Sequence, residues 1–594
     1  MTRVRGSQVW QLFSVMHRAA PRAAVLWWAL IVLRGILPAA FALSMGVLVD
    51  AVQNDALLAP GLTLVGFVFV AMQSLGPVHD AVSSNLGAKT SSWLHDRLLD
   101  ACITPPGLAH LEDSDLADEL STARDFDIGL TGPSMTYSMP NIGGGLASFA
   151  GGLAQALLLF GYRWWAPIVV GGAWLSTHHF LKSGAMWRGR TSDEVMEQQR
   201  KADYAYRLTV HSPAAKEVRL FGLADWVVGG FTSLRKHLMD LSWEERRLRW
   251  RPTWVAIALI TAANALFFWS LAQSAADGAV TIGSLVVFAQ AAIGASALAF
   301  GEFDWWLRTS AQPVPLVLGL VDKMAPIGML PTGDRAADGM PAHEIRFEGV
   351  RFAYPSSPAG AVFDGFDLTI PAGRSIAIVG QNGAGKTTLA KLVCRMYDPA
   401  AGSVRVDGVD LRDLDVVSWR SRVAAVFQDF VRYELPLRDN VAPAGAADEV
   451  VLGSLADARA EHLASLDTVL SKQYADGTDL SGGQWQRVAL ARALASVRLG
   501  AGVVILDEPT AQLDVRGEAE IFERLIDATR GCTTILISHR FSTVRRADLI
   551  CVIEHGQVVE MGSHQELIAR GGRYRTMFEL QAARFEEPEL EVLD

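Results

Sequence analysis

Six long apolar stretches in the first half of the chain limit the folds that it can adopt. Read with approximate edges, they cover residues 23–49, 57–78, 141–161, 164–185, 252–274 and 281–303. Each has roughly 20 residues or more, which is enough for a helix to cross about 30 Å of lipid hydrocarbon. Buried helices of a large soluble core are the alternative, but six such stretches in one half favour membrane-spanning helices.

The composition agrees with a membrane part and argues against other classes of protein. Of the 594 residues, 50% are hydrophobic and only 20% are charged, and the mean hydropathy is +0.22. Soluble domains usually carry more charge. The net charge of −10 lacks the basic excess of a nucleic-acid binder, so we expect no nucleic acid as partner. The four cysteines have no metal-binding spacing, which excludes a disulfide framework and a cysteine zinc site.

Loop length and charge predict how the chain crosses the membrane. Three connections are short and together contain one basic residue, Arg163: residues 50–56, 162–163 and 275–280. Two are long and charged, over residues 79–140 and 186–251. By the positive-inside rule, we expect the long loops and both termini in the cytoplasm, with membrane helices that continue into it. The first 22 residues predict a short amphipathic helix lying on the membrane surface.

The sequence pattern changes after residue 325. Residues 326–342 are rich in Pro and Gly without periodicity and predict a linker. From residue 343 onward, strand patterns such as EIRFEGVRF, SIAIVG, VVILDE and TTILISH alternate with helices, which predicts an α/β domain with a largely parallel sheet. We therefore expect an all-α membrane domain of six helices over residues 1–325, then the linker, then an α/β domain over residues 343–594.

A phosphate-binding motif follows the strand SIAIVG. The sequence GQNGAGKTT matches GxxxxGK[ST] in the required context of strand, loop and helix. Glycines let the backbone curl around phosphates with its N–H groups pointing inward, Lys386 supplies a cation, and Thr387 offers a hydroxyl to Mg²⁺. The candidate nucleotide-binding residues are Gly380, Gln381, Asn382, Gly383, Ala384, Gly385, Lys386, Thr387 and Thr388.

A second motif supplies two carboxylates. The apolar run VVIL ends in Asp507 and Glu508, and the carboxyl end of a buried strand lies at the ligand-binding edge of such a sheet. We predict that Asp507 holds Mg²⁺ and that Glu508 orients or deprotonates the attacking water. The motif alone is weak, but together with the phosphate loop it indicates a P-loop ATPase.

The stretch LSGGQ at residues 480–484 resembles the signature of ATP-binding cassette (ABC) proteins, and further elements follow in the order of that family from about residue 343 to 580. The resemblance implies that Tyr354 stacks on adenine and that His539 contacts the γ-phosphate. It implies that Gln428 reaches Mg²⁺ and the attacking water, and that Asp514 belongs to the D-loop. Each of these residues alone would be unremarkable; their order in the chain carries the prediction.

In that family two cassettes face each other head to tail. The resemblance implies that Ser481, Gly482, Gly483 and Gln484 bind the ATP held by the partner's phosphate loop, so that a chain with one cassette must dimerise. Six spans before one cassette resemble a half-transporter of the exporter-type fold. Heterodimeric exporters commonly lose the catalytic glutamate in one chain. With Glu508 present, this chain would be the competent half of such a pair or either half of a homodimer, and we favour the homodimer.

Two cytoplasmic segments resemble the coupling helices of that family, at residues 110–124 and 212–222. We expect them to press into a groove near the Gln428 loop of a cassette; ordinary amphipathic helices in a solvated loop are the alternative. One stretch departs from the family pattern, because TVLSKQYADG at residues 468–477 stands where exporters often carry TxVGxxG.

The expected activity is ATP-driven transport by alternating access, with ATP and Mg²⁺ as cofactors. We favour export of a hydrophobic or amphipathic compound such as a lipid, a drug or a modified peptide. Import of a siderophore-like cargo is the alternative, and a non-transporting ATP sensor is disfavoured because the catalytic residues are intact. Four ionisable residues lie at or near membrane depth: Arg34, Glu302, Asp304 and Arg308. Such residues often line a pathway; the alternatives are that they pair across helices or that residues 302–308 emerge into the cytoplasm.

Arginine outnumbers lysine 44 to 9, and Ala and Gly are abundant. This bias is typical of a GC-rich bacterial genome. We therefore expect a bacterial cytoplasmic membrane as the location, with the lipid bilayer around the six spans and the cassette in the cytoplasm.

Overall fold

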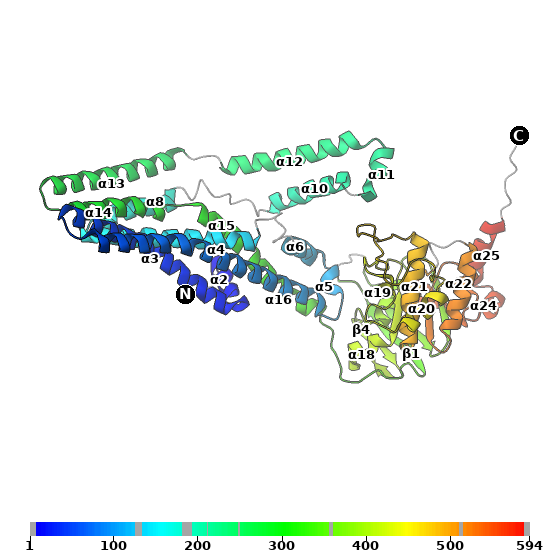
Figure 1. Cartoon of the computed structure of the whole chain (residues 1–594). Coiled ribbons are helices and arrows are strands. Elements are labelled where there is room, and N and C mark those ends of the chain that lie inside the picture. Colours follow the sequence, from blue (N-terminus) through cyan, green and yellow to red (C-terminus); the bar gives the residue numbers. More distant parts are fainter. Residues whose placement is uncertain are drawn as a thin grey trace. The chain divides into compact units, whose positions relative to one another are not determined.

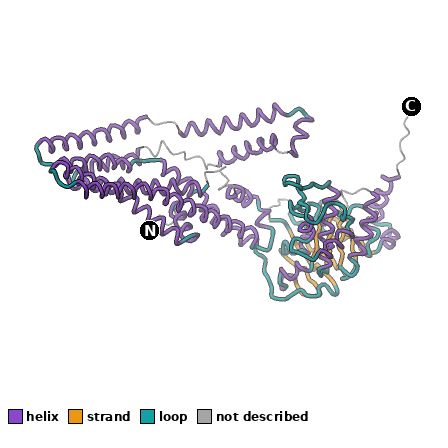
Figure 2. Tube along the Cα trace, in the orientation of Figure 1, coloured by secondary structure: helices purple, strands orange, loops and turns teal. Residues whose placement is uncertain are grey.

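The computed structural model describes residues 7–124, 134–180, 193–210, 212–246, 250–355, 360–509 and 515–586. It divides into two compact units (Figures 1 and 2). The first comprises Met1–Leu99 and Leu120–Gly319, and the second comprises Asp100–Glu119 and Leu320–Asp594. The second unit therefore contains a short part of the first long loop together with the cassette.

The N-terminal half of the chain is built of helices in its described residues (Figure 2). The α-helices are α2 (Gln8–Ala19), α3 (Pro21–Gln53), α4 (Leu58–Ile103), α5 (Ala109–Glu112), α6 (Ser114–Arg124), α7 (Met135–Leu158), α8 (Ala166–Phe180), α10 (Asp193–Val210), α11 (Ser212–Leu220), α12 (Ala224–Arg246), α13 (Trp250–Ala276), α14 (Ile282–Gly294), α15 (Glu302–Ala311) and α16 (Pro313–Gly328). Two short 3₁₀ helices are η2 (Leu159–Gly161) and η4 (Ala295–Leu298).

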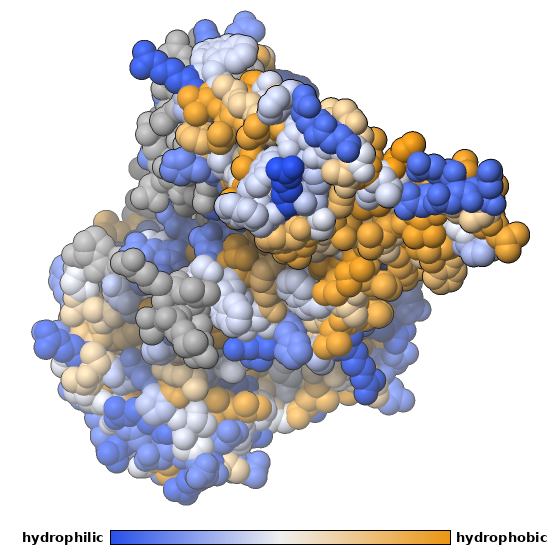
Figure 3. All heavy atoms as spheres, turned by 90° about the vertical axis from the view of Figure 1, so that its left-hand side faces the viewer, coloured by the Kyte–Doolittle hydropathy of each residue, from blue (hydrophilic) through white to orange (hydrophobic). Residues whose placement is uncertain are grey.

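Helix lies in each of the six predicted spans. Five helical segments of the described residues are long and apolar enough to cross a membrane: Pro21–Gln53, Leu58–Ile103, Met135–Gly161, Trp250–Ala276 and Ile282–Gly328. The stretch predicted over residues 164–185 contains α8, and residues 181–192 lie outside the described part. Exposed apolar side chains such as Phe67 (75% exposed) and Trp254 (61%) occur on these helices, and Figure 3 shows a broad hydrophobic area on one face.

Small residues bring the spanning helices into close contact. Helix α3 packs against α7 and α14. A Cβ atom placed on Gly35 would lie only 2.6 Å from the Cβ of Ala150, so these two backbones can meet only because Gly35 has no side chain. A hydrogen bond of 2.9 Å from the buried Trp27 Nε1 to Ser83 Oγ joins α3 to α4.

The predicted amphipathic N-terminal helix forms as α2, and part of its apolar side packs against other helices. Leu12, Val15 and Met16 are at most 1% exposed, and α2 packs against α3 and α15. The position of this helix at the membrane surface stays a prediction.

The sixth predicted span is interrupted. Helix α14 ends at Gly294, the 3₁₀ turn η4 follows, and α15 starts at Glu302 after an extended Ala299 and Gly301. A helix break at membrane depth frees backbone groups that must find other partners. Side chains of α8 satisfy two of them, because His178 Nε2 donates to the carbonyl of Leu298 at 3.0 Å and the N–H of Phe300 donates to Thr177 Oγ1 at 2.7 Å.

Two of the ionisable residues noted in the spans have polar neighbours. Arg34 Nη1 donates to His79 Nδ1 at 2.5 Å and lies 3.8 Å from Asp80 Oδ1. Asp304 Oδ2 lies 3.8 Å from His178 Nδ1. Pairing across helices, one of the interpretations left open by the sequence, therefore applies to Arg34. The side chain of Glu302 lies outside the described part.

Both predicted cytoplasmic segments are helical. Residues 110–124 contain the end of α5 and all of α6, and α11 covers most of residues 212–222. Helices α10 and α12, which precede and follow α11 in the chain, pack side by side (Figure 1). The role of these helices in coupling stays a prediction.

The cassette contains two sheets. Its strands are β1 (Glu344–Phe352), β2 (Phe363–Pro371), β3 (Ser375–Gly380), β4 (Ala401–Val406), β5 (Val409–Asp410), β6 (Val423–Val426), β7 (Val503–Asp507), β8 (Thr533–Ile537), β9 (Leu549–Glu554) and β10 (Gln557–Gly562). The six-stranded sheet has the order β10-β9-β3-β8-β7-β6 and is parallel except for β10. A four-stranded antiparallel sheet, β2-β1-β4-β5, was not predicted.

Helices pack around the parallel sheet. The α-helices are α17 (Lys386–Val393), α18 (Val416–Ser421), α19 (Leu437–Val441), α20 (Asp448–Asp457), α21 (Gly482–Arg498), α22 (Val515–Ala528), α23 (Phe541–Val544), α24 (His564–Arg570) and α25 (Arg573–Glu586), with the 3₁₀ helix η5 (Leu411–Asp413). Strands β7 and β8 are buried along their whole length, as expected for a parallel sheet covered on both faces.

We predict that Thr177→Val destabilises the helical unit. Thr177 is 1% exposed, and valine would leave the N–H of Phe300 without a partner, at a cost of about 1–3 kcal/mol. Thermal unfolding of the full chain in detergent should show a lower Tm. Thr177→Ser keeps the hydroxyl and should recover most of the loss.

The matched control is Thr209→Val, because the exposed Thr209 hydroxyl bonds to Ala205 of its own helix. This control should leave Tm nearly unchanged. If Thr177→Val were as stable as the wild type, the side chain of Thr177 would not be what satisfies the helix break.

Candidate nucleotide-binding site

The phosphate loop connects the central strand β3 to α17. Gly380 has φ +155°, and a Cβ atom there would lie 2.2 Å from the carbonyl oxygen of Ile553 in the neighbouring strand. Only glycine therefore fits where the loop leaves the sheet. Lys386 Nζ donates to the carbonyls of Gly380 and Gln381 at 3.0 and 2.9 Å. Burial lowers the pKa of Lys386 from its ordinary value, and the nearby carboxylates of Glu508 and Asp507 oppose that shift.

The predicted metal ligands Thr387 and Asp507 lie together. Thr387 Oγ1 donates to Asp507 Oδ2 at 2.8 Å, and Asp507 is only 3% exposed. Burial raises the pKa of Asp507 above its ordinary value, while the hydrogen bond from Thr387 lowers it. A hydroxyl and a carboxylate oxygen beside a phosphate loop are the kind of ligands that Mg²⁺ takes with a nucleotide, so these residues fit that ion.

Glu508 and His539 form a pair at the same sheet edge. Glu508 has φ +50°, a conformation that non-glycine residues seldom adopt and that is often found at functional sites. Its N–H donates to the carbonyl of Ile537 at 2.8 Å. This bend brings Glu508 Oε1 to 3.0 Å from His539 Nδ1, which donates to it. The strained backbone thus directs a carboxylate towards the imidazole.

The register of the parallel sheet explains why these residues meet. Asp507 on β7 and Ile378 on β3 both lie opposite Ile537 on β8. The residues that follow each strand therefore emerge at one edge. Val426 lies opposite Leu506, so the exposed Gln428, two residues after β6, follows its strand at the same edge.

Aromatic and charged side chains surround Tyr354. Its hydroxyl is hydrogen-bonded to Thr388 Oγ1 at 3.1 Å, Lys391 Nζ lies 5.1 Å from the centre of its ring, and the ring of Tyr397 lies 5.4 Å away. Lys391 and Tyr397 both contact Glu112, which comes from the first long loop. One side of the expected adenine platform is therefore built from residues that the sequence motifs did not indicate.

The pKa shifts of this cluster keep it charged and hydrogen-bonded. Burial alone would lower the pKa of Lys391, but the hydrogen bond to Glu112 and nearby groups including Asp429 raise it above its ordinary value. Burial and the Glu112 carboxylate raise the pKa of Tyr397 well above its ordinary value. Lys391 is therefore a cation and Tyr397 a hydrogen-bond donor at neutral pH.

The signature residues begin α21. Ser481 Oγ accepts from the N–H of Gln484 at 3.4 Å, and Gln484 Oε1 accepts from the N–H of Ser481 at 2.8 Å, which is a capping box. Among the described residues, no hydrogen bond joins Ser481 or Gln484 to the phosphate loop of the same chain. The side chain of Gln484 therefore caps its own helix.

The structure brings most of the predicted site residues together and leaves others apart. The phosphate loop, Asp507, Glu508 and His539 share one sheet edge, and Tyr354 contacts the first turn of α17. Asp514 lies outside the described residues. Sequence reasoning missed Glu112, Lys391 and Tyr397. The only signal for Glu112 was its place in a segment that resembles a coupling helix.

The fold is that of a helical, membrane-type domain followed by an α/β nucleotide-binding cassette. The family model for ABC transporters matches residues 363–511, and members of that family are ATPases coupled to transport. A solved structure of a bacterial Atm1-family ABC exporter with ATP bound superposes with a TM-score of 0.72 at 22% identity, over 96% of this chain and 99% of that one.

Curated relatives match part of the chain. ABC transporter B family member 17 of Arabidopsis thaliana is 39% identical over 254 residues, 42% of this chain and 20% of that protein. Leptomycin B resistance protein pmd1 of Schizosaccharomyces pombe is 36% identical over 300 residues, 48% of this chain and 22% of that protein. The chain thus spans about a fifth of the length of these relatives.

We predict that Asp507→Asn stabilises the protein at neutral pH. Because the pKa of Asp507 is raised by folding, the unfolded state loses its proton at a lower pH than the folded state. The free energy of unfolding then falls as pH rises between the two pKa values. Above the pKa of folded Asp507 that loss is complete, so there the uncharged Asp507→Asn variant should have the higher Tm, by roughly 2–4 °C for each kcal/mol regained.

Thermal unfolding of the full chain at a series of pH values measures this effect. The difference in Tm between Asp507→Asn and the wild type should shrink as pH falls through the pKa of folded Asp507. Asp527→Asn is the control, since Asp527 is exposed and its ion pair is with the exposed Arg530. A lower Tm for Asp507→Asn at pH 7 would contradict the account.

Proposed function

We propose that this chain is one half of an ATP-driven membrane transporter that hydrolyses ATP with Mg²⁺. The observation that carries the proposal is the Glu508–His539 pair, which lies at the sheet edge where the phosphate loop presents Lys386 and Thr387. A structural ion pair would not require a strained backbone at Glu508 beside a phosphate loop. The matched family and the exporter fold support the same activity.

Each residue of the edge has a role in this proposal. The backbone of residues 380–388 and the N-terminus of α17 cradle the phosphates. Lys386, now bonded to two loop carbonyls, exchanges them for phosphate oxygens. Thr387 and Asp507 would hold Mg²⁺, which would supply positive charge to the phosphates. Glu508 takes the proton of the attacking water, and His539 orients Glu508 by donating from Nδ1.

The site is incomplete in one chain, and we propose that a second copy completes it. Ser481 starts a helix whose N-terminus can face a γ-phosphate, since residues 482 and 483 carry no side chains. This helix start is not bonded to the phosphate loop of its own chain in the described residues. A homodimer supplies it from the partner cassette, with Gln428, Tyr354 and Asp514 in the roles that the resemblance implies.

We propose export of a hydrophobic or amphipathic compound across the cytoplasmic membrane of a bacterium, with α11 and residues 110–124 as coupling helices. The exposed apolar helices support a place in the bilayer, and the excess of arginine supports a bacterial origin. Import by the same fold is the second candidate. Labelled cargo in inside-out and right-side-out vesicles separates the two: export requires ATP-dependent uptake by inside-out vesicles alone.

Two variants of the chain, purified alone in lipid nanodiscs, test the roles of Glu508 and Lys386. Glu508→Gln should bind ATP but hydrolyse it at least about 100-fold more slowly, because the general base is lost. Lys386→Ala should instead weaken ATP binding. Phosphate release and equilibrium ATP binding measure the two effects. Hydrolysis by Glu508→Gln at the wild-type rate would overturn the role of Glu508.

Two further variants test whether each ATP site is shared between two chains. Lys386→Ala and Ser481→Arg should each abolish hydrolysis as homodimers, because every site then contains one defect. When the two variants are co-expressed, a mixed dimer places the intact Lys386 of one chain opposite the intact Ser481 of the other. Hydrolysis should return in the purified mixed dimer. If it does not, each site is contained in one chain and the head-to-tail dimer is wrong.

A further inference from the structure

A carboxylate from the first long loop contacts the expected adenine platform. Glu112 ends α5, and its Oε1 accepts from Lys391 Nζ at 2.9 Å, while its Oε2 accepts from the hydroxyl of Tyr397. Lys391 and Tyr397 both flank Tyr354. All four residues belong to the second unit. No sequence motif assigns a role to Glu112, Lys391 or Tyr397.

Main-chain hydrogen bonds fix the segment that presents Glu112. The N–H of Gly107 donates to the carbonyl of Gly328 at 2.8 Å, and the N–H of Leu108 donates to that of Met396 at 3.1 Å. Arg420 Nη2 donates to the carbonyl of Pro106 at 2.6 Å. Bonds to backbone groups do not depend on flexible side chains of the segment, so Glu112 is held at a defined place.

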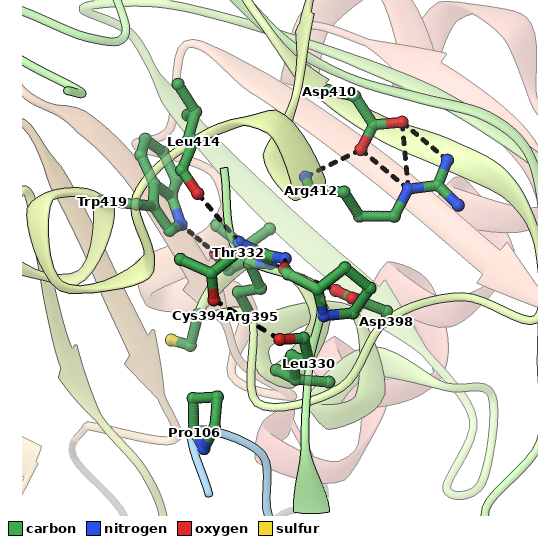
Figure 4. A network of polar contacts seen from close by, with 12 residues as sticks. Pro106, Leu330, Thr332, Cys394, Arg395, Asp398, Asp410, Arg412, Leu414 and Trp419 are labelled. Atoms are coloured by element: carbon green, nitrogen blue, oxygen red, sulfur yellow. Dashed lines mark hydrogen bonds and ion pairs between the residues drawn. The ribbon is translucent and has the colours of Figure 1, made fainter. Parts of the chain in front are cut away.

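The residues beneath this segment are also fixed. Arg395 is fully buried, and its guanidinium donates to the carbonyl of Leu414 at 3.1 Å, to that of Pro331, and to Asp398 Oδ1 at 3.2 Å (Figure 4). Its own carbonyl accepts from Arg420, which also binds Pro106. The linker and the loop segment are therefore tied to one rigid network at the end of α17.

The contacts run in sequence from the loop to the nucleotide site. Glu112 neutralises Lys391, whose ammonium lies over the ring of Tyr354, and it holds the hydroxyl of Tyr397, whose ring packs on Tyr354. Tyr354 in turn bonds to Thr388 in the first turn of α17. Removing the Glu112 charge leaves Lys391 with Asp429 as the remaining nearby carboxylate.

We infer that Glu112 is a positioning residue for the nucleotide base, and that the first cytoplasmic loop thereby sets the affinity of the cassette for ATP. This inference rests on the proposed function. Glu112 acts on the base through Tyr354 and leaves the phosphate contacts of residues 380–387 unchanged. Because coupling free energies are reciprocal, bound ATP also strengthens the docking of the loop segment on its cassette.

Glu112→Gln tests the inference in the full chain in nanodiscs. Glutamine keeps the size of the side chain and still accepts the bond from Tyr397, but it no longer neutralises Lys391. The KM for ATP should rise roughly three- to fivefold, as for the loss of a partly buried ion pair beside an aromatic ring, while kcat changes by less than about twofold.

Inorganic tripolyphosphate distinguishes positioning of the base from general damage. This ion occupies the phosphate loop without a base, so its inhibition constant against ATP hydrolysis should be equal for Glu112→Gln and the wild type. An inhibition constant that rises as much as the KM for ATP would mean that the whole loop is disturbed, and would overturn the inference. An unchanged KM for ATP would overturn it as well.

Two further variants complete the test. Glu119→Gln breaks another ion pair of the same segment, with Lys323 at 2.5 Å, and should leave the KM for ATP unchanged. In a Lys391→Met background, Glu112→Gln should raise the KM little further, because the two residues act as a unit. Full additivity of the two variants would contradict the proposed path.

The test is separable from that of the proposed function. If the wild type does not hydrolyse ATP, the proposed function fails, and the affinity of Glu112→Gln for ATP is then measured by equilibrium binding with tripolyphosphate as competitor. Weaker ATP binding at an unchanged tripolyphosphate affinity supports the role of Glu112 in either case, and equal ATP binding contradicts it.

Discussion

The parallel register of β3, β8, β7 and β6 is the constraint on which the cassette depends. Side chains that follow parallel strands must emerge at one edge, and here that edge collects the phosphate loop, Asp507, Glu508 and His539. At the ends of these buried strands, Asp507 bonds to Thr387 and Glu508 bends to His539. The buried negative charge of Asp507 at this edge destabilises the folded state, as its raised pKa indicates.

A related constraint governs the helical unit. Backbone groups freed at membrane depth must be satisfied inside the protein, and the interruption after α14 is tolerated because Thr177 and His178 lie opposite it on α8. Arg34 is likewise paired with His79. These polar residues of the spans stabilise the fold, so the presence of polar residues alone does not indicate a cargo pathway.

The sequence predicted what local pattern determines. Apolar length predicted helix in each of the six stretches. The motifs GxxxxGK[ST] and VVILDE predicted that the phosphate loop and two carboxylates share one sheet edge, because each motif requires its residue types at fixed spacing. The features that the sequence did not indicate depend on contacts between distant residues. They are the packing of α2 against α3 and α15, the break after α14 and the separate antiparallel sheet. Glu112 meets Tyr397 across 285 positions of the sequence, and no periodicity or motif can indicate such a contact.

The phosphate contacts and the base contacts of the proposed nucleotide site depend on different parts of the chain. In the proposed site, the phosphates are bound by backbone groups whose positions the sheet fixes. The base is expected to stack on Tyr354, whose neighbours contact a loop segment that is joined through Arg420 and Arg395 to the linker. The segment follows α4 directly in the chain. If Glu112 positions the base as inferred, the first long loop senses bound ATP through the base and not through the phosphates.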